Sequence, residues 1–234
     1  ISYPGYNDLI TGNSSSQIKT NEHPVNPHYN YLELLCQKKK VRPEKVSIST
    51  SWYKFIDIFN CPRNKFKIIN WPTHTKKKKV FQKDIVKLPR YKYKALPRRK
   101  DVSEIHHDLL VYSLLLKNIK NESPDFIFLN LGLTDYYGHK NNYYEYWNHL
   151  VLADSALENL VKETQKIDKY RDNSVYFITT DHGRGNEPDT FAEHSGDVSG
   201  SEESWLIVYG KNIKPGKVTK KTANTKVFDM LMKY

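Results

Sequence analysis

The chain has 234 residues, of which 38% are hydrophobic and 27% charged, and its 37 Lys and Arg against 26 Asp and Glu give a net charge of +11. This balance is typical of a folded globular protein and excludes disorder, collagen and coiled coil. No apolar run reaches the roughly 18 residues of a membrane-spanning helix, and no signal-peptide pattern opens the chain.

Short apolar runs rich in β-branched residues alternate with helical patterns along the chain. A helix or turn is expected first, ending at Thr11-Gly12. Strands are predicted at residues 45–50, 66–69, 125–131, 174–180 and 204–209, with helices at 101–121 and 141–169. This alternation predicts an α/β layered protein with a mostly parallel central sheet. We expect a three-layer α/β/α sandwich, built as a single domain over residues 1–234.

Each predicted helix carries an apolar stripe at helical spacing. In the first, the stripe comprises Ile105, Leu109, Tyr112, Leu116 and Ile119, with Asp101 and Ser103 as candidate caps. In the second, it comprises Tyr144, Trp147, Leu150, Val151, Leu157, Leu160 and Val161. We expect both stripes to face the core.

The segment at residues 70–100 shows no clean period and holds much of the positive charge, including Lys76 to Lys79. It is interpreted as a basic irregular insertion or small cap. The charge favours a solvated surface over a nucleic-acid interface, because no nucleic-acid-binding motif accompanies it. It would still draw an anionic substrate toward a site.

Two of the predicted strands end in an aspartate and a histidine. Asp135 and His139 follow the strand at 125–131, and Asp181 and His182 follow the strand at 174–180. Functional groups in open α/β sheets collect beyond the carboxyl ends of the strands, so both pairs are expected to face one site. Carboxylate and imidazole suit a divalent cation such as zinc.

A further histidine, His194, lies in the polar loop before the last strand. Five ligand-type residues exceed what one zinc needs, which favours a two-metal site. Each element alone has a plainer interpretation: Asp-His-Gly is a common turn, and Asp135 with His139 fits a helix start with a surface histidine. Their joint occurrence at successive strand ends carries the metal hypothesis.

Ser2 precedes the first predicted helix, where free amides favour an anion. A serine there can act as a nucleophile if a metal lowers its hydroxyl pKa. From position alone, an N-cap role is the favoured alternative.

As a set, these motifs resemble the alkaline phosphatase superfamily, and they look closest to its phosphodiesterase, nucleotide pyrophosphatase and phosphoglyceromutase-like branches. The resemblance rests on Ser2-Tyr3-Pro4-Gly5 with Leu9-Ile10-Thr11-Gly12, Thr134-Asp135 with Gly138-His139, Thr180-Asp181-His182-Gly183-Arg184-Gly185, and His194. It implies that Ser2 is transiently phosphorylated. It also implies that Asp135, His139 and His194 hold one zinc, while Asp181, His182 and the Ser2 oxygen hold the other; Mn²⁺ could replace zinc. Arg184 would contact a substrate oxyanion.

The resemblance has three departures. The family carries one more ligand aspartate on a strand upstream of the nucleophile, which we expect in a segment preceding residue 1; the alternative is an incomplete second metal site. Gly5 stands where phosphodiesterase relatives have an oxyanion-binding Asn, which leaves the Tyr3 amide or Asn7 for that role. The sulfatase motif is absent, since Cys61-Pro62-Arg63 has the wrong spacing, and so is the glycolytic mutase motif.

The resemblance therefore implies a metal-dependent hydrolase of anionic phosphate esters, diester or monoester, in a periplasmic or secreted location. Two alternatives stay open: a phosphotransferase or mutase with the same intermediate, and a non-catalytic module that binds an anionic polymer through its lysines. The sequence gives no indication of the oligomeric state.

Overall fold

The computed structural model describes residues 1–15, 17–70, 86–88, 90 and 108–234. The chain divides into two compact units. Unit 1 comprises residues 1–41, 56–64 and 169–234, and unit 2 comprises residues 42–55 and 65–168.

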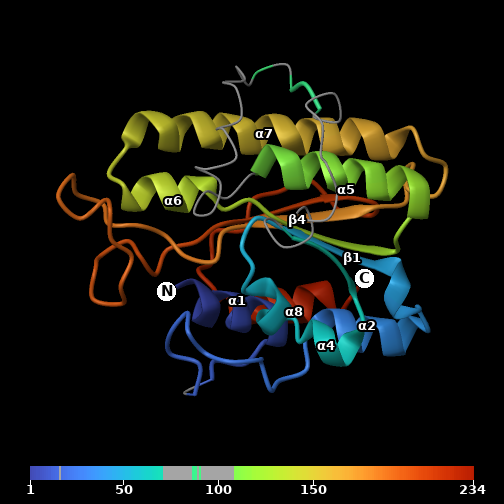
Figure 1. Cartoon of the computed structure of the whole chain (residues 1–234), viewed down its shortest axis with the longest axis horizontal. Helices are drawn as coiled ribbons and strands as arrows, with labels where there is room; N and C mark the ends of the chain where they lie inside the picture. Colours follow the sequence, from blue (N-terminus) through green and yellow to red (C-terminus); the bar gives the residue numbers. More distant parts are fainter. Residues whose placement is uncertain (16, 71–85, 89, 91–107) are drawn as a thin grey trace. The chain divides into compact units, whose positions relative to one another are not determined.

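Unit 2 is built on a three-stranded parallel sheet in the order β2-β1-β3 (Figure 1). Its strands are β1 (Val46–Thr50), β2 (Lys67–Asn70) and β3 (Phe126–Asn130). The central strand β1 is buried along its whole length, and Ile48 pairs with Ile68 on one side and Phe128 on the other. Continuous burial of this kind is typical of a parallel strand covered on both faces.

Helix α5 (Asp108–Glu122) packs against β1, and the Ser49 hydroxyl donates a hydrogen bond of 2.9 Å to the Val111 carbonyl oxygen. The predicted stripe is confirmed where the structure describes it: Leu109, Tyr112, Leu116 and Ile119 are all buried. The predicted positions Asp101, Ser103 and Ile105 lie outside the described residues.

Helix α7 (Tyr143–Gln165) confirms the predicted second helix but not its whole stripe. Tyr144, Trp147 and Leu150 are exposed, so their predicted burial is wrong, whereas Leu160 is buried. The buried face is instead formed mainly by smaller and polar side chains: His149, Leu152, Ser155, Ala156, Leu160 and Thr164. α7 packs against α5 and α6 (Leu133–His139), and small residues allow the helices to approach closely. The spacing of the apolar residues alone therefore did not identify the whole buried face.

Unit 2 also contains the short 3-10 helix η1 (Pro43–Lys45), which leads into β1. Helix α3 (Phe55–Ile58) begins in unit 2 and continues into unit 1.

Unit 1 contains a two-stranded antiparallel sheet and several helices. The strands are β4 (Val175–Thr179) and β5 (Leu206–Gly210), and the helices are α1 (Ser2–Thr11), α2 (Tyr31–Lys39), α4 (Cys61–Asn64) and α8 (Thr225–Leu231). α1 packs against α8, as the blue and red helices of Figure 1 show. The core of unit 1 includes Tyr3, Ile10, Leu32 and Phe59.

The predicted α/β class is confirmed, with all five predicted strands found within two residues of their expected ends. The parallel part of the sheet is the β2-β1-β3 sheet, whereas β4 and β5 pair antiparallel. The single catalytic domain stays a prediction. Most of the insertion predicted at residues 70–100 lies outside the described residues.

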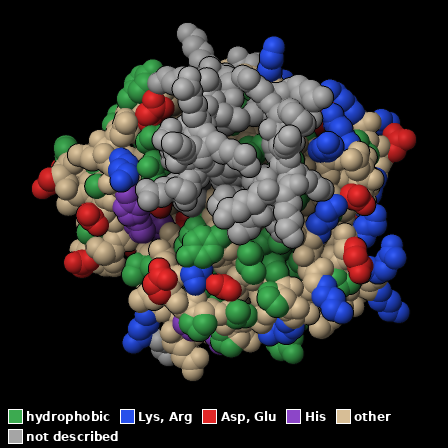
Figure 2. Space-filling view, viewed as in Figure 1, with side chains coloured by type: hydrophobic (Ala, Val, Ile, Leu, Met, Phe, Trp, Pro, Cys, Tyr) green, Lys and Arg blue, Asp and Glu red, His purple; other side chains and the backbone are tan. Residues whose placement is uncertain are grey.

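On the face drawn in Figure 2, the Lys and Arg side chains of the described residues are interspersed with acidic ones. Several basic side chains of the described residues are paired with acidic ones: Arg90 contacts Asp154 and Glu158, and Lys120 lies 2.7 Å from Glu163. Such pairs are typical of a solvated surface. The lysine run at residues 76–79 lies outside the described residues. Among the helices that the structure describes, none is long and apolar enough to cross a membrane.

The end of α1 provides a test of the packing in unit 1. Gly12 has a φ of 68°, and a Cβ there would lie 2.9 Å from the Phe228 ring of α8. We expect Gly12→Ala to lower the free energy of unfolding by about 1–3 kcal/mol, because the variant combines a left-handed backbone with overpacking. Urea unfolding measures the change.

The control for this substitution is Lys40→Gly at the exposed left-handed end of α2, where φ is 54°. Glycine relieves strain there, so this variant should be as stable as the wild type or more so. A Gly12→Ala protein with the wild-type urea midpoint would contradict the packing described.

Candidate metal centre

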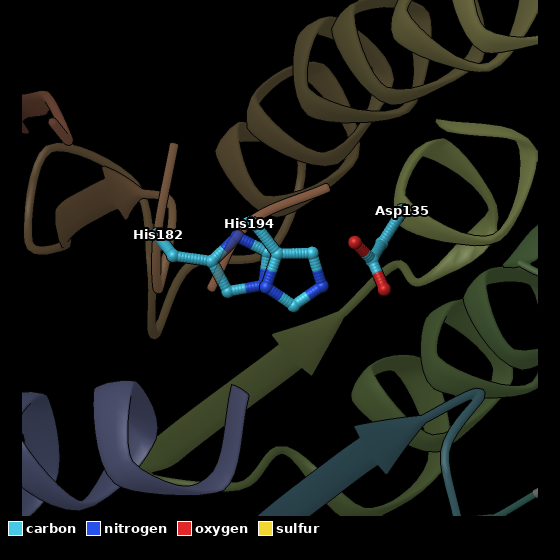
Figure 3. Close-up of side chains that lie close together, drawn as sticks. All are labelled: Asp135, His182 and His194. Carbon is cyan, nitrogen blue, oxygen red and sulfur yellow. The ribbon is translucent and has the colours of Figure 1, made fainter. Parts of the chain in front are cut away.

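Unit 1 gathers four of the predicted site residues around one imidazole ring. The His182 Nε2 atom lies 3.2 Å from the Ser2 Oγ atom and 3.4 Å from the Asp181 Oδ2 atom. The His194 ring stacks face to face on the His182 ring, with centroids 3.8 Å apart and planes 9° apart (Figure 3). Side chains from α1, from the end of β4 and from the loop before β5 therefore converge within one unit.

The tautomer of His182 follows from its second nitrogen. The Nδ1 atom lies 2.8 Å from the Gly183 carbonyl oxygen. A carbonyl oxygen can only accept, so Nδ1 carries a proton and donates it. In the neutral ring the lone pair then resides on Nε2, on the side of Ser2 and Asp181. Histidines that bind metals are commonly oriented by such a backbone hydrogen bond.

The turn that carries Asp181 and His182 requires a glycine for steric reasons. A Cβ at Gly183 would collide with the backbone carbonyl oxygens of Gly200 and Glu203. The Gly183 amide donates a hydrogen bond of 2.8 Å to the Ser201 carbonyl oxygen. The glycine therefore permits a close approach of two chain segments.

Arg184 stabilises the loop that holds His194. Its Nη1 atom donates hydrogen bonds of 3.0 Å to the carbonyl oxygens of Phe191 and Ala192. The Gly185 amide donates to the Glu193 carbonyl oxygen at 3.1 Å. His194 itself is buried, with 8% of its surface exposed. The role of Arg184 that the structure displays is thus to fix this loop, and a contact with substrate stays a prediction.

Ser2 is the first residue of α1 and is 9% exposed. The N-cap of α1 is Ile1, with no side-chain capping bond, so Ser2 does not cap the helix as its position alone had favoured. Its hydroxyl instead faces the His182 ring. Gly5 allows this placement, because a Cβ there would lie 2.6 Å from the Asp181 carbonyl oxygen.

The two groups predicted to bind a substrate oxyanion are engaged within unit 1. The Tyr3 amide donates to Asn21 Oδ1 at 2.9 Å, and the Tyr3 side chain is fully buried. Asn7 is 1% exposed; its Nδ2 donates to the Asn13 carbonyl oxygen, and its Oδ1 accepts from Asn26. In this structure both groups serve the fold of the N-terminal segment, and their role in binding an oxyanion stays a prediction.

In unit 2, Asp135 and His139 lie one helical turn apart on α6, directly after β3. Asp135 Oδ2 is 3.5 Å from His139 Nε2, and the two side chains are 37% and 45% exposed. The spacing therefore brings the two donors together on one helix, as predicted from the sequence. Figure 3 labels Asp135 on α6.

Two buried residues of unit 2, Asp108 and His149, were not predicted from the sequence to support the site. Asp108 Oδ1 and Oδ2 accept hydrogen bonds of 2.8 and 2.9 Å from the amides of Gly132 and Leu133, at the start of α6. Burial raises the pKa of Asp108, against hydrogen bonds from Ser51, Leu133 and Gly132 that lower it. His149 stacks on Tyr137 of α6, with centroids 4.9 Å apart. An acidic residue at a helix start can be recognised in a sequence, but the helix was predicted to begin at residue 101 rather than at Asp108.

A family model described as "Metalloenzyme: Metalloenzyme superfamily" matches residues 98–228, more than half of the chain. The chain belongs to the Metalloenzyme superfamily. This superfamily is part of the alkaline phosphatase-like clan, so the predicted resemblance is confirmed. The match covers Asp135, His139, Asp181, His182 and His194, whereas Ser2 lies outside it. No curated protein and no solved structure match the chain.

The donors of unit 1 fit the divalent ion that membership of the Metalloenzyme superfamily indicates. The unprotonated His182 Nε2 and the Asp181 carboxylate are both acceptors, and acceptors 3.4 Å apart repel unless a cation or proton lies between them. One donor nitrogen of His194 lies within 4.8 Å of one of His182. Imidazole with carboxylate is a ligand set that zinc accepts.

The contact between α1 and the Asp181 turn can be tested with Gly5→Ala. The added methyl group would push α1 away from the Asp181 carbonyl oxygen and lengthen the distance between Ser2 and His182. We expect zinc affinity to fall about tenfold or more, because the orientation of the donors sets that affinity. Competition with a chelating dye measures it.

Gly216→Ala is the matched control, since a Cβ there meets nothing within 4 Å. This variant should bind zinc like the wild type. Equal zinc affinities for the Gly5 and Gly216 variants would rule out the role given to the close approach at Gly5.

Proposed function

We propose that the protein is a metal-dependent phosphoric ester hydrolase, with Ser2 as the nucleophile and two bound divalent ions. Zn²⁺ is the preferred candidate for both ions. The proposal rests on membership of the Metalloenzyme superfamily and on the residues of unit 1. The observation that carries it is the Ser2 hydroxyl 3.2 Å from the unprotonated nitrogen of His182. Ser2 lies at a helix start but does not cap the helix, and its hydroxyl instead contacts a histidine that can bind a metal. This position suits a nucleophile.

In this proposal Asp181, His182 and the Ser2 oxygen hold one ion, and Asp135, His139 and His194 hold the other. Family membership and the order of the motifs support this division. Bound divalent ions supply Lewis-acid stabilisation of phosphoryl oxygens and make the Ser2 hydroxyl more acidic. Mn²⁺ is the alternative metal for the same nitrogen and oxygen ligands.

The reaction then proceeds in two displacements. Ser2 Oγ forms a bond to phosphorus as it loses its proton, and the bond from phosphorus to the leaving oxygen breaks; that oxygen leaves as an alcohol with a proton. Water next attacks the phosphorus of the phosphoserine, the bond to Oγ breaks, and Oγ takes up a proton. A monoester yields inorganic phosphate and a diester yields a monoester.

The start of α1 favours this chemistry. The first amides of a helix lack partners within the helix, and the positive end of the helix dipole stabilises an anion beside Ser2. The ring of His182 is held by the Gly183 carbonyl, so it does not have to reorient during a turnover. By analogy with its superfamily, we also propose a periplasmic or secreted location.

The mechanism predicts distinct outcomes for three alanine variants. Ser2→Ala should abolish hydrolysis of 4-nitrophenyl phosphate and bis(4-nitrophenyl) phosphate, a loss of about 10³-fold or more, yet still bind zinc. His182→Ala and Asp135→Ala should lose turnover and weaken zinc binding, because each removes a proposed ligand. Steady-state kinetics with elemental analysis distinguish these results.

A chelator provides the corresponding test on the unmodified protein. EDTA should stop turnover and added Zn²⁺ should restore it. A fully active Ser2→Ala protein would refute the nucleophile. Anion binding that ignores chelator and falls steeply with salt would instead support the non-catalytic module.

A further inference from the structure

The metal-ligand helix α6 has no N-terminal cap of its own. Its N-cap residue is Gly132, which has no side chain, and the helix is seven residues long. A helix this short does not hold its place by itself, since isolated helices need about 12–15 residues to be even marginally stable. Something outside α6 must therefore fix Asp135 and His139.

Asp108, the first residue of α5, supplies this support. Its two carboxylate oxygens accept from the amides of Gly132 and Leu133 at 2.8 and 2.9 Å. The Gly132 amide also lies 3.0 Å from the Ser51 Oγ atom, and Ser51 forms a further hydrogen bond to the Asp108 carboxylate. Asp108 and Ser51 are each 1% exposed, so water does not compete for these bonds.

The support is itself attached to the core of unit 2. α5 packs against β1, and Ser51 directly follows β1. Tyr137 of α6 also stacks on the buried His149 of α7, with the ring planes 6° apart. Tyr137 lies between Asp135 and His139 in the sequence, so α6 is restrained within the ligand pair as well as at its start.

We propose that Asp108 is a positioning residue of the metal centre, which holds α6 so that Asp135 and His139 present their donor atoms together. It does not touch the metal or the substrate. This inference rests on the proposed function for the identity of the ligands, while the restraint on α6 can be measured independently of any metal.

The isosteric variant Asp108→Asn tests the inference. The amide keeps one acceptor oxygen but directs an NH₂ group at one of the two backbone amides, so one bond is lost and two donors oppose each other. Hydrogen exchange of the peptide at residues 131–139 should become at least tenfold faster, because α6 opens locally. The dissociation constant for zinc should rise about tenfold, the lower end of what outer supports of metal ligands contribute.

Two serines of the same segment serve as a matched pair. Ser51→Ala removes a group bonded to both Asp108 and Gly132, so it should shift exchange and zinc affinity in the same direction as Asp108→Asn, by less. Ser49→Ala removes a buried hydrogen bond to α5 but no contact with α6. It should lower the urea midpoint and leave the zinc affinity at the wild-type value. If Asp108→Asn does not fold, the serine pair still decides the question.

Two results would overturn the inference. One is wild-type exchange at residues 131–139 with wild-type zinc affinity in Asp108→Asn. The other is equal weakening of zinc binding by Ser49→Ala and Ser51→Ala, which would show a general loss of stability. Failure of the proposed function looks different: the wild type would bind no zinc, or Asp135→Asn would bind it normally, whatever the exchange of α6.

Discussion

The hydrogen bond from His182 Nδ1 to the Gly183 carbonyl is the constraint on which the candidate centre depends. It places the proton on one nitrogen and leaves the other as an acceptor beside Ser2 and Asp181. The neighbouring segments meet at distances that only glycine permits, at Gly5 and Gly183. The backbone thus brings the Ser2 hydroxyl and the His182 lone pair together, which is the preorganisation that the proposed catalysis requires.

The ligand-type residues are supported differently in the two units. In unit 1 they lie on irregular turns, which are fixed by backbone hydrogen bonds and by Arg184. In unit 2 they lie on α6, which is fixed at its start by Asp108 and Ser51. In both units the ligand-type side chains follow the carboxyl end of a strand, β4 in unit 1 and β3 in unit 2. Functional groups of α/β proteins commonly lie at this position.

Much of this was predictable because it depends on local sequence. Strand ends, the spacing of Asp135 and His139 and the glycine after His182 are short-range patterns, and the family they indicate is confirmed. The failures depend on tertiary packing. Trp147 lies on the apolar stripe that the helical spacing predicts, yet it is exposed and α7 buries Ala156 instead. The hydrogen bonds that Asn7 forms with Asn13 and Asn26 likewise depend on packing that no local pattern shows. Asp108 supports a helix 25 residues away, which no local pattern indicates.

The central claim is that Ser2 carries the phosphoryl group during turnover. The most direct test is rapid acid quench of the zinc-loaded protein with 4-nitrophenyl phosphate, followed by mass spectrometry of the peptide that contains Ser2. The account predicts a peptide heavier by one phosphoryl group, which disappears in Ser2→Ala and in the presence of EDTA. Turnover with no modified Ser2 peptide, under conditions that trap a control phosphoserine, would contradict it.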